Sequence, residues 1–208
     1  MFKRPAFIDQ FRQSIFNKLL KNKHKTNEIE LQHKTIYVLP SKLGGQFLLI
    51  ALLNFVMGIN YQNNLILAMA YLMVVVLVFA ILTGYKNVRG LSVKYQSVNE
   101  SYAPNAPIAR FQIQAKSYCE LIKLINDNFE SETVSLQSKE KKTVEIALKC
   151  SERGAYGFDR IKIISHFPFG LVSVWSYIEP TETVYVYPQP IAAEKLDTQL
   201  HDNDEHDG

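Results

Sequence analysis

The hydrophobic and polar positions of this chain form three patterns along its length, and the first is helical. Residues 5–21 repeat apolar side chains at a spacing of three or four: Phe7, Ile8, Phe11, Ile15, Phe16, Leu19 and Leu20. This spacing predicts an amphipathic helix with Pro5 in its first turn and basic side chains away from the apolar stripe. The helix would either pack on the rest of the protein or lie in a lipid interface, and the hairpin predicted next favours the interface.

Two runs without any charged residue follow, over residues 47–59 and 65–82. The second, extended to Tyr85, has the roughly 20 residues that a helix needs to cross a bilayer, and the first reaches across only with residues 43–46. Together they predict a transmembrane helical hairpin over residues 43–86. The alternative, a buried hairpin in a soluble core, is disfavoured because no face of the second run carries charge.

The polar residues of the predicted hairpin are asparagines. Those of the connection are expected to cap the helix ends and hydrate the turn: Asn60, Asn63 and Asn64. Asn54 lies in the middle of the first run, where its side chain is expected to hydrogen-bond across to the other helix.

From Gly90 onward apolar residues alternate with polar ones, as they do in half-buried strands. Eight segments alternate at least in part: 91–95, 108–113, 121–125, 134–136, 144–148, 158–163, 171–175 and 184–187. Turn-forming residues separate them, and such spacing predicts an antiparallel Ig-like β-sandwich over residues 88–192, with Trp175 as a core anchor. The predicted fold class is therefore an α+β membrane protein, with an N-terminal amphipathic helix, a two-helix transmembrane hairpin and this β-sandwich. A polar connection is expected over residues 22–42, and an acidic, disordered tail over residues 193–208.

The distribution of charge predicts how the chain is oriented in the membrane. The chain has 208 residues, 47% of them hydrophobic, and a net charge of +3, which excludes collagen-like, wholly disordered and disulfide-dense secreted classes. Residues 1–42, a basic head, carry nine Lys and Arg against three Asp and Glu, whereas residues 194–208 carry one against six. Because Lys and Arg flank both predicted spans and are absent between them, both termini are expected in the cytoplasm and the chain in the cytoplasmic (inner) membrane.

Candidate chemistry is sparse. Of five histidines only His166 lies within the predicted β-sandwich, and the chain has no nucleophile, phosphate-loop or zinc-protease motif. We therefore expect no enzyme, no cofactor and no metal site; the acidic tail fails the EF-hand pattern because Gly208 comes one position late and no closing Glu follows. Cys119 and Cys150 are interpreted as small core residues in a reducing compartment, although the sequence leaves a disulfide between them open.

Four motifs together resemble a known family. Gly58-Ile59-Asn60-Tyr61-Gln62-Asn63-Asn64-Leu65 lies between the apolar runs, and Arg153-Gly154-Ala155-Tyr156, Phe167-Pro168-Phe169-Gly170-Leu171 and Tyr187-Pro188-Gln189-Pro190 follow in order. This series is similar to the bacterial membrane proteins called domain of unknown function 58, and the resemblance covers residues from about 39 to 190. In that family a further domain follows the last motif, so the resemblance implies the N-terminal part of such a protein.

The resemblance also implies partners. Family members commonly occur beside MoxR-type AAA+ ATPases and are thought to act as membrane-bound partners or assembly factors. The Phe167–Leu171 turn and Arg153 are candidates for a docking surface, although packing explains a turn with two phenylalanines equally well.

Two functional hypotheses follow. The first is a membrane-anchored scaffold whose cytoplasmic β-sandwich binds protein partners, among them a MoxR-type ATPase. The alternative is a cell-envelope protein with an extracytoplasmic β domain that assists envelope enzyme or carrier chemistry. Nucleic acid is not an expected partner, because the aromatic residues of the basic head line its apolar stripe instead of alternating with Lys and Arg.

Overall fold

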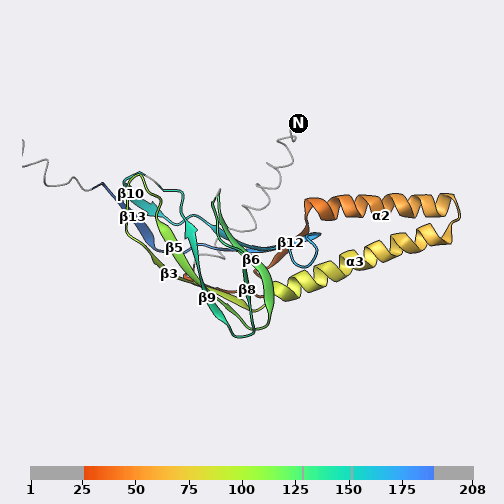
Figure 1. The fold of residues 1–208 in the computed structure, drawn as a ribbon, viewed down its shortest axis with the longest axis horizontal. Coiled ribbons are helices and arrows are strands. Elements are labelled where there is room, and N and C mark those ends of the chain that lie inside the picture. Colours follow the sequence, from red (N-terminus) through yellow and green to blue (C-terminus); the bar gives the residue numbers. More distant parts are fainter. Residues whose placement is uncertain (1–25, 128, 151, 190–208) are drawn as a thin grey trace, which may run out of the picture.

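The computed structural model describes residues 26–127, 129–150 and 152–189. The predicted amphipathic helix over 5–21 and the predicted acidic tail over 193–208 lie outside these residues. Two long helices project from one end of a β-stranded body, which we call the β domain (Figure 1). The described part of the chain is thus α+β, with two long apolar helices and mostly antiparallel sheets.

The helical hairpin consists of α2, Lys42–Asn60, and α3, Asn64–Val88. Helix α2 begins at Lys42 because Ser41 caps it, its side chain accepting a hydrogen bond from the Gly44 amide. The first helix therefore does include residues 43–46, as predicted from the shortness of its apolar run. The second is longer than predicted and continues to Val88, directly before the β domain.

Thirteen strands are present in the described residues: β1 Glu28–Glu30, β2 Tyr37–Pro40, β3 Leu91–Val98, β4 Ser101–Tyr102, β5 Ile108–Ala115, β6 Cys119–Asn126, β7 Phe129–Glu130, β8 Val134–Leu136, β9 Lys141–Ala147, β10 Gly154–Gly157, β11 Ile161–Ser165, β12 Val172–Ile178 and β13 Thr183–Tyr187. They form sheets in the orders β1-β3-β5-β9, β10-β13-β4 and β2-β12-β11-β6-β7, with β8 also paired to β6. Every described pairing is antiparallel except that of β13 with β4.

The structure corrects the interpretation of residues 22–42 as a polar connection, because two strands lie there. Strand β1 pairs with β3, bringing Ile29 opposite Val93, and β2 pairs with β12, bringing Val38 opposite Val174. Both strands are short, and their partners lie more than 60 residues away in the sequence. The apolar alternation within each segment was therefore too brief to show that a sheet would extend over it.

A second correction concerns residues 153–163. Arg153 and Gly154 are among the turn-forming residues that separate the predicted strands, but Gly154 begins strand β10, whose partner is β13. The strand predicted to start at Phe158 starts instead at Ile161. Two glycines in a four-residue strand give a low intrinsic β propensity, so pairing with β13 decides the conformation here.

One hydrophobic core joins strands of all three sheets with the end of α3. Alternate residues of β5 and of the first half of β3 are buried, whereas β11 is buried at every position except Lys162. Phe111 and Ile163 are fully enclosed. Ala80 and Val88 of α3 belong to the same core. Trp175 is buried as expected, and its ring stacks on Tyr37 of β2 with 6.4 Å between centroids.

Candidate functional site

The outward side chains of the helical hairpin are apolar and uncovered. Leu65, Leu72 and Leu82 are each more than half exposed, and fewer than one residue in five of either apolar stretch is buried. At 1.5 Å per residue, α2 is about 28 Å long and α3 about 37 Å. Both helices are long and apolar enough to cross a membrane.

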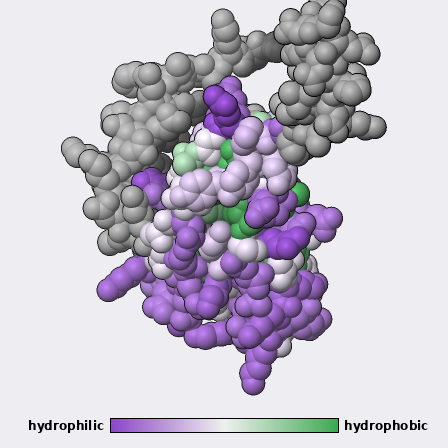
Figure 2. Space-filling model, turned by 90° about the vertical axis from the view of Figure 1, so that its left-hand side faces the viewer, coloured by the Kyte–Doolittle hydropathy of each residue, from purple (hydrophilic) through white to green (hydrophobic). Residues whose placement is uncertain are grey.

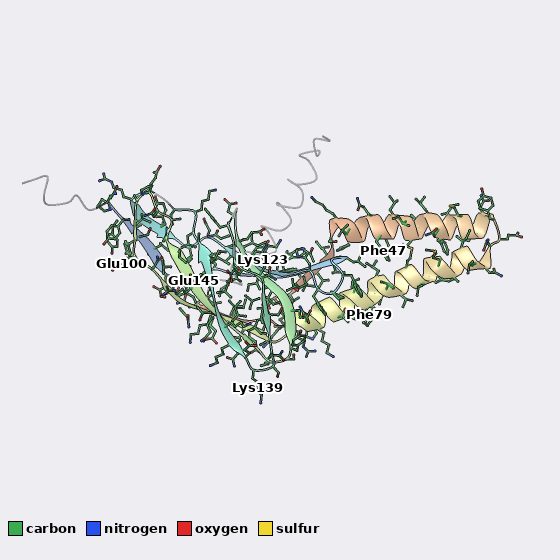
Figure 3. The ribbon with its side chains drawn as sticks, in the orientation of Figure 1. Phe47, Phe79, Glu100, Lys123, Lys139 and Glu145 are labelled. Carbon is green, nitrogen blue, oxygen red and sulfur yellow. The ribbon has the colours of Figure 1, made fainter. Side chains whose placement is uncertain are left out.

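The charges of the helices lie only at the end next to the β domain. Lys42 is the first residue of α2, and Lys86 lies in the last turn of α3. Figure 3 shows the same segregation: the labelled Phe47 and Phe79 lie on the helices, whereas the labelled charged residues lie on the β domain. Charge and exposed apolar surface are thus separated along the long axis of the molecule.

The two helices pack through small residues. A Cβ atom added to Gly58 would lie 2.9 Å from the amide nitrogen of Leu67, so the backbones approach closely near the tip. Asn54 points across to the other helix as predicted, its side-chain amide 3.6 Å from the sulfur of Met73. At the tip, Asn63 caps α3 by accepting from the amides of Leu65 and Ile66.

The three asparagines at the tip have different roles. Asn63 caps a helix end, as expected, whereas Asn60 is the last residue of α2 and Asn64 is the first residue of α3. All three are exposed. The three-residue connection therefore needs only one capping side chain.

We call the junction between the helices and the β domain the hairpin base. On the α2 side, Ser41 donates its backbone N–H to the carbonyl oxygen of Leu171 at 2.9 Å, and its hydroxyl donates to the carbonyl oxygen of Gly170. A Cβ atom on Gly44 would lie 1.9 Å from that Leu171 oxygen. Only glycine can occupy this position of α2 while the helix stays against the turn.

On the α3 side, the hairpin base is held by Asn87, which is buried. Its amide nitrogen donates to the carbonyl oxygen of Glu120 at 2.8 Å and to the Ser165 hydroxyl at 3.1 Å, and its oxygen accepts from the Glu120 amide at 2.8 Å. One turn earlier, a Cβ atom on Gly84 would lie 2.9 Å from the carbonyl oxygen of Phe167. The side chain of Asn87 therefore has both its oxygen and its nitrogen satisfied inside the protein.

The structure thus places the Phe167–Leu171 turn between the two helices at the hairpin base. Phe167, Pro168 and Leu171 are half-buried, whereas Phe169 is 57% exposed. Gly170 adopts φ +70°, a left-handed conformation that glycine allows without strain. The structure assigns this turn a packing role against the hairpin, with Phe169 left over as an uncovered aromatic side chain.

Arg153, Gly154 and Tyr156 lie elsewhere. Strand β10 belongs to the small sheet with β13 and β4, at the end of the β domain opposite the helices (Figure 1). Arg153 is exposed, and the Tyr156 hydroxyl donates to the carbonyl oxygen of Glu152 at 3.1 Å. The two motifs that were candidates for one docking surface are therefore not brought together.

The same small sheet carries a surface that we call the tyrosine face, made of Tyr102, Tyr185 and Tyr187. All three are exposed, and the rings of Tyr102 and Tyr187 lie 6.1 Å apart. On the neighbouring strand β10, Ala155 lies opposite Tyr185 and is too small to cover its ring. Figure 2 shows this end of the molecule, mostly hydrophilic with paler, weakly polar residues gathered towards its top.

No metal-ligand cluster of three or more His, Cys, Asp or Glu occurs in the described residues. His166 precedes the turn at the hairpin base, and partial desolvation of its ring, with Lys162 and Lys123 nearby, lowers its pKa. Cys119 and Cys150 are buried free thiols.

Sequence reasoning missed Asn87 and the tyrosine face. Asn87 comes after Lys86, just beyond the apolar run, and was interpreted only as part of the charged flank of that run. The tyrosines of β13 lie in the segment 184–187, which the alternation identified only as a strand. The signal available was that Thr183, Tyr185 and Tyr187 share one face of that strand.

Comparison of this chain with models of known protein families, with curated proteins and with solved structures finds no match. The similarity to domain of unknown function 58 therefore rests on the four motifs.

Proposed function

We propose that the chain is a membrane-anchored scaffold: α2 and α3 span the cytoplasmic membrane of a bacterium, and the β domain, an Ig-like β-sandwich, binds a protein partner in the cytoplasm. The observation that carries this proposal is the exposed apolar surface of the hairpin, which is charged only next to the β domain and is joined directly to a body with exposed tyrosines at its other end. The motif resemblance adds the family and, with it, a MoxR-type AAA+ ATPase as the partner.

The membrane assignment is supported by the free energy that exposing the apolar helices to water would cost. In water, the leucines, valines and phenylalanines of both helices would remain hydrated, at about 25 cal/mol per Å² of apolar surface. A bilayer core of about 30 Å matches the length of α2, and the longer α3 fits by tilting or by extending into the interface. Backbone hydrogen bonds are satisfied within each helix, as lipid requires.

The cytoplasmic orientation is supported by where the cations lie. Lys42, Lys86 and Arg89 are exposed at the hairpin base, and the connection at the tip, Tyr61–Asn63, has no charge. Under the positive-inside rule, the base faces the cytoplasm and the tip the opposite side. The buried free thiols of Cys119 and Cys150 suit a reducing compartment.

The tyrosine face supports partner binding. Tyrosine gives large, rigid contact area at small entropic cost and is enriched among residues that dominate binding energy. The face lies at the end of the β domain that points away from the hairpin, where a soluble protein can reach it (Figure 1). Strand β10 is an edge strand of this sheet and pairs with β13, which carries Tyr185 and Tyr187.

Cysteine labelling tests the membrane topology. Tyr61→Cys at the tip and Glu100→Cys on the β domain are exposed sites, whereas the native cysteines are buried. A membrane-impermeant maleimide should label Tyr61→Cys in intact cells and Glu100→Cys only after permeabilisation. Labelling of Glu100→Cys alone in intact cells would reverse the topology and favour the envelope alternative.

Affinity capture tests the partner. In cells that encode a MoxR-type ATPase, crosslinked full-length chain should recover that ATPase, and the double variant Tyr185→Ala/Tyr187→Ala should lose at least ten-fold in recovery, about 1.4 kcal/mol or more. Tyr61→Ala, which removes a tyrosine at the hairpin tip, is the matched control and should behave as the parent. Recovery of no ATPase by the parent chain would refute this partner.

A further inference from the structure

We propose that Phe169, Tyr118 and Leu121 form an apolar rim around the hairpin base that enters the lipid interface and seats the β domain on the membrane surface. The inference rests on the proposed membrane hairpin and goes beyond it, because it makes the β domain itself a lipid-binding element. The occupant of this surface is the boundary between headgroups and acyl chains.

The first part of the rim is Phe169. Packing does not explain its position, because 57% of its surface is exposed while its neighbour Phe167 is half-buried. The turn that carries it lies against the first turn of α2, where a Cβ atom on Gly170 would be 3.8 Å from Leu43. Leu43 is itself exposed and begins the apolar surface of α2, so Phe169 continues that surface onto the β domain.

The second part lies beside α3. The backbone of Glu120 is bonded to Asn87 of α3, so Leu121 is one residue away from a direct contact with the last turn of that helix. The pairing of β6 with β8 shifts in register between Cys119 and Ile122, and Leu121 adopts φ +55°. This bulge leaves Leu121 44% exposed, although leucine disfavours the left-handed conformation.

Tyr118 completes this side with a ring that is 52% exposed and a hydroxyl that donates to the Glu120 carboxylate. A side chain with an apolar ring and a satisfied polar tip suits the interface between lipid and water, where tyrosine is enriched. The Phe167–Leu171 turn between the helices and the bulged start of β6 beside α3 therefore both present aromatic or aliphatic side chains at the level where the helices leave the β domain.

Charge at the same level fits a lipid surface. Lys42, Lys86 and Arg89 are exposed at the ends of α2 and α3 next to the β domain. Cations beside inserted apolar side chains bind anionic headgroups while the apolar groups enter the acyl region. A protein partner at this position would have to share the surface with the membrane itself.

Depth measurements by spin labelling test the rim. The full-length chain in lipid nanodiscs would carry a nitroxide at Phe169→Cys or Leu121→Cys, with collision rates for oxygen and for a water-soluble nickel complex as the readout. Both labels should favour oxygen, as lipid-buried sites do. The matched control is Phe129→Cys on β7, an exposed phenylalanine that pairs with the opposite end of β6 and should favour the nickel complex.

A fourth label, Leu72→Cys in the middle of α3, separates the two proposals. If Leu72 reports the lipid core while Phe169 and Leu121 match Phe129, the hairpin spans the membrane and the rim proposal is refuted. If Leu72 also reports water, the proposed membrane anchor itself is wrong.

Discussion

Asn87 pairs with the backbone of Glu120 as a neighbouring strand would, donating to its carbonyl oxygen and accepting from its amide, both at 2.8 Å. A helix and a strand end are thereby joined through one side chain. Because Asn87 is buried and its bonds to Glu120 are partly buried, shortening the side chain leaves the Glu120 backbone groups without their protein partner where water has little access.

Asn87→Ala should therefore lower the free energy of unfolding of the β domain by about 1–3 kcal/mol, the cost of leaving buried backbone groups unsatisfied. Denaturant unfolding in detergent micelles, followed by Trp175 fluorescence, measures the change. Asn60→Ala, an exposed asparagine of α2, is the control and should change stability by less than about 0.5 kcal/mol. Equal effects of the two substitutions would show that the Asn87 bonds contribute nothing.

Two adjacent glycines of α2 should respond in opposite directions to alanine. At Gly44 the new methyl group would lie 1.9 Å from the Leu171 oxygen, so the helix must move from the turn, at a cost of about 1–3 kcal/mol. At Gly45 nothing lies within 4 Å, and alanine's higher helix propensity should stabilise the protein by up to about 1 kcal/mol. Thermal unfolding of the two variants and the parent in one detergent compares them; a harmless Gly44→Ala would mean that the turn does not rest on α2.

The two native thiols should be inert in the folded protein. Burial raises the pKa of both Cys119 and Cys150, which reduces the thiolate that reacts with maleimides. Mass spectrometry should find neither modified at neutral pH within the time that fully labels Glu100→Cys, and both modified in guanidinium. Rapid labelling of either native cysteine would contradict the packed core around it.

His166 should make the hairpin base sensitive to acid. Its folded pKa lies below the ordinary value of 6.5, so the unfolded chain binds the proton more readily as pH falls through that value. The stability contributed by neutral His166 is therefore complete above about pH 6.5 and declines below it. Unfolding at about pH 7.5 and about pH 5.5 should show a smaller loss for His166→Gln than for the parent; identical losses would exclude His166 as the cause.

The helices could be predicted from the sequence because their signal is local. Helix α2 has 19 residues and α3 has 25, and each carries a lysine only at the end next to the β domain. Such a sequence has few alternatives to a long apolar helix. The longer strands β3, β5 and β6 were predicted for the same reason, since each alternates over several residues. Strands β1 and β10 were not, because Ile29 is the only buried residue of β1 and β10 is half glycine.

The candidate surfaces depended on three-dimensional neighbours that no local pattern contains. The Phe167–Leu171 turn looked like one part of a docking surface with Arg153, yet it packs beneath the hairpin while Arg153 lies at the other end. The importance of Gly44 comes from Leu171, which is 127 positions away. Such long-range contacts are set by the pairing of β2 with β12, two strands whose register the sequence alone left undetermined.

Only Ser41 separates β2 from α2, and only Arg89 and Gly90 separate α3 from β3. Neither connection is long enough to act as a flexible tether, and both are hydrogen-bonded into the hairpin base. If the helices are held in a bilayer, a force applied at the tyrosine face is therefore transmitted through the β domain to the helices in the lipid. A partner that pulled there would tilt the helices before it stretched any segment between them.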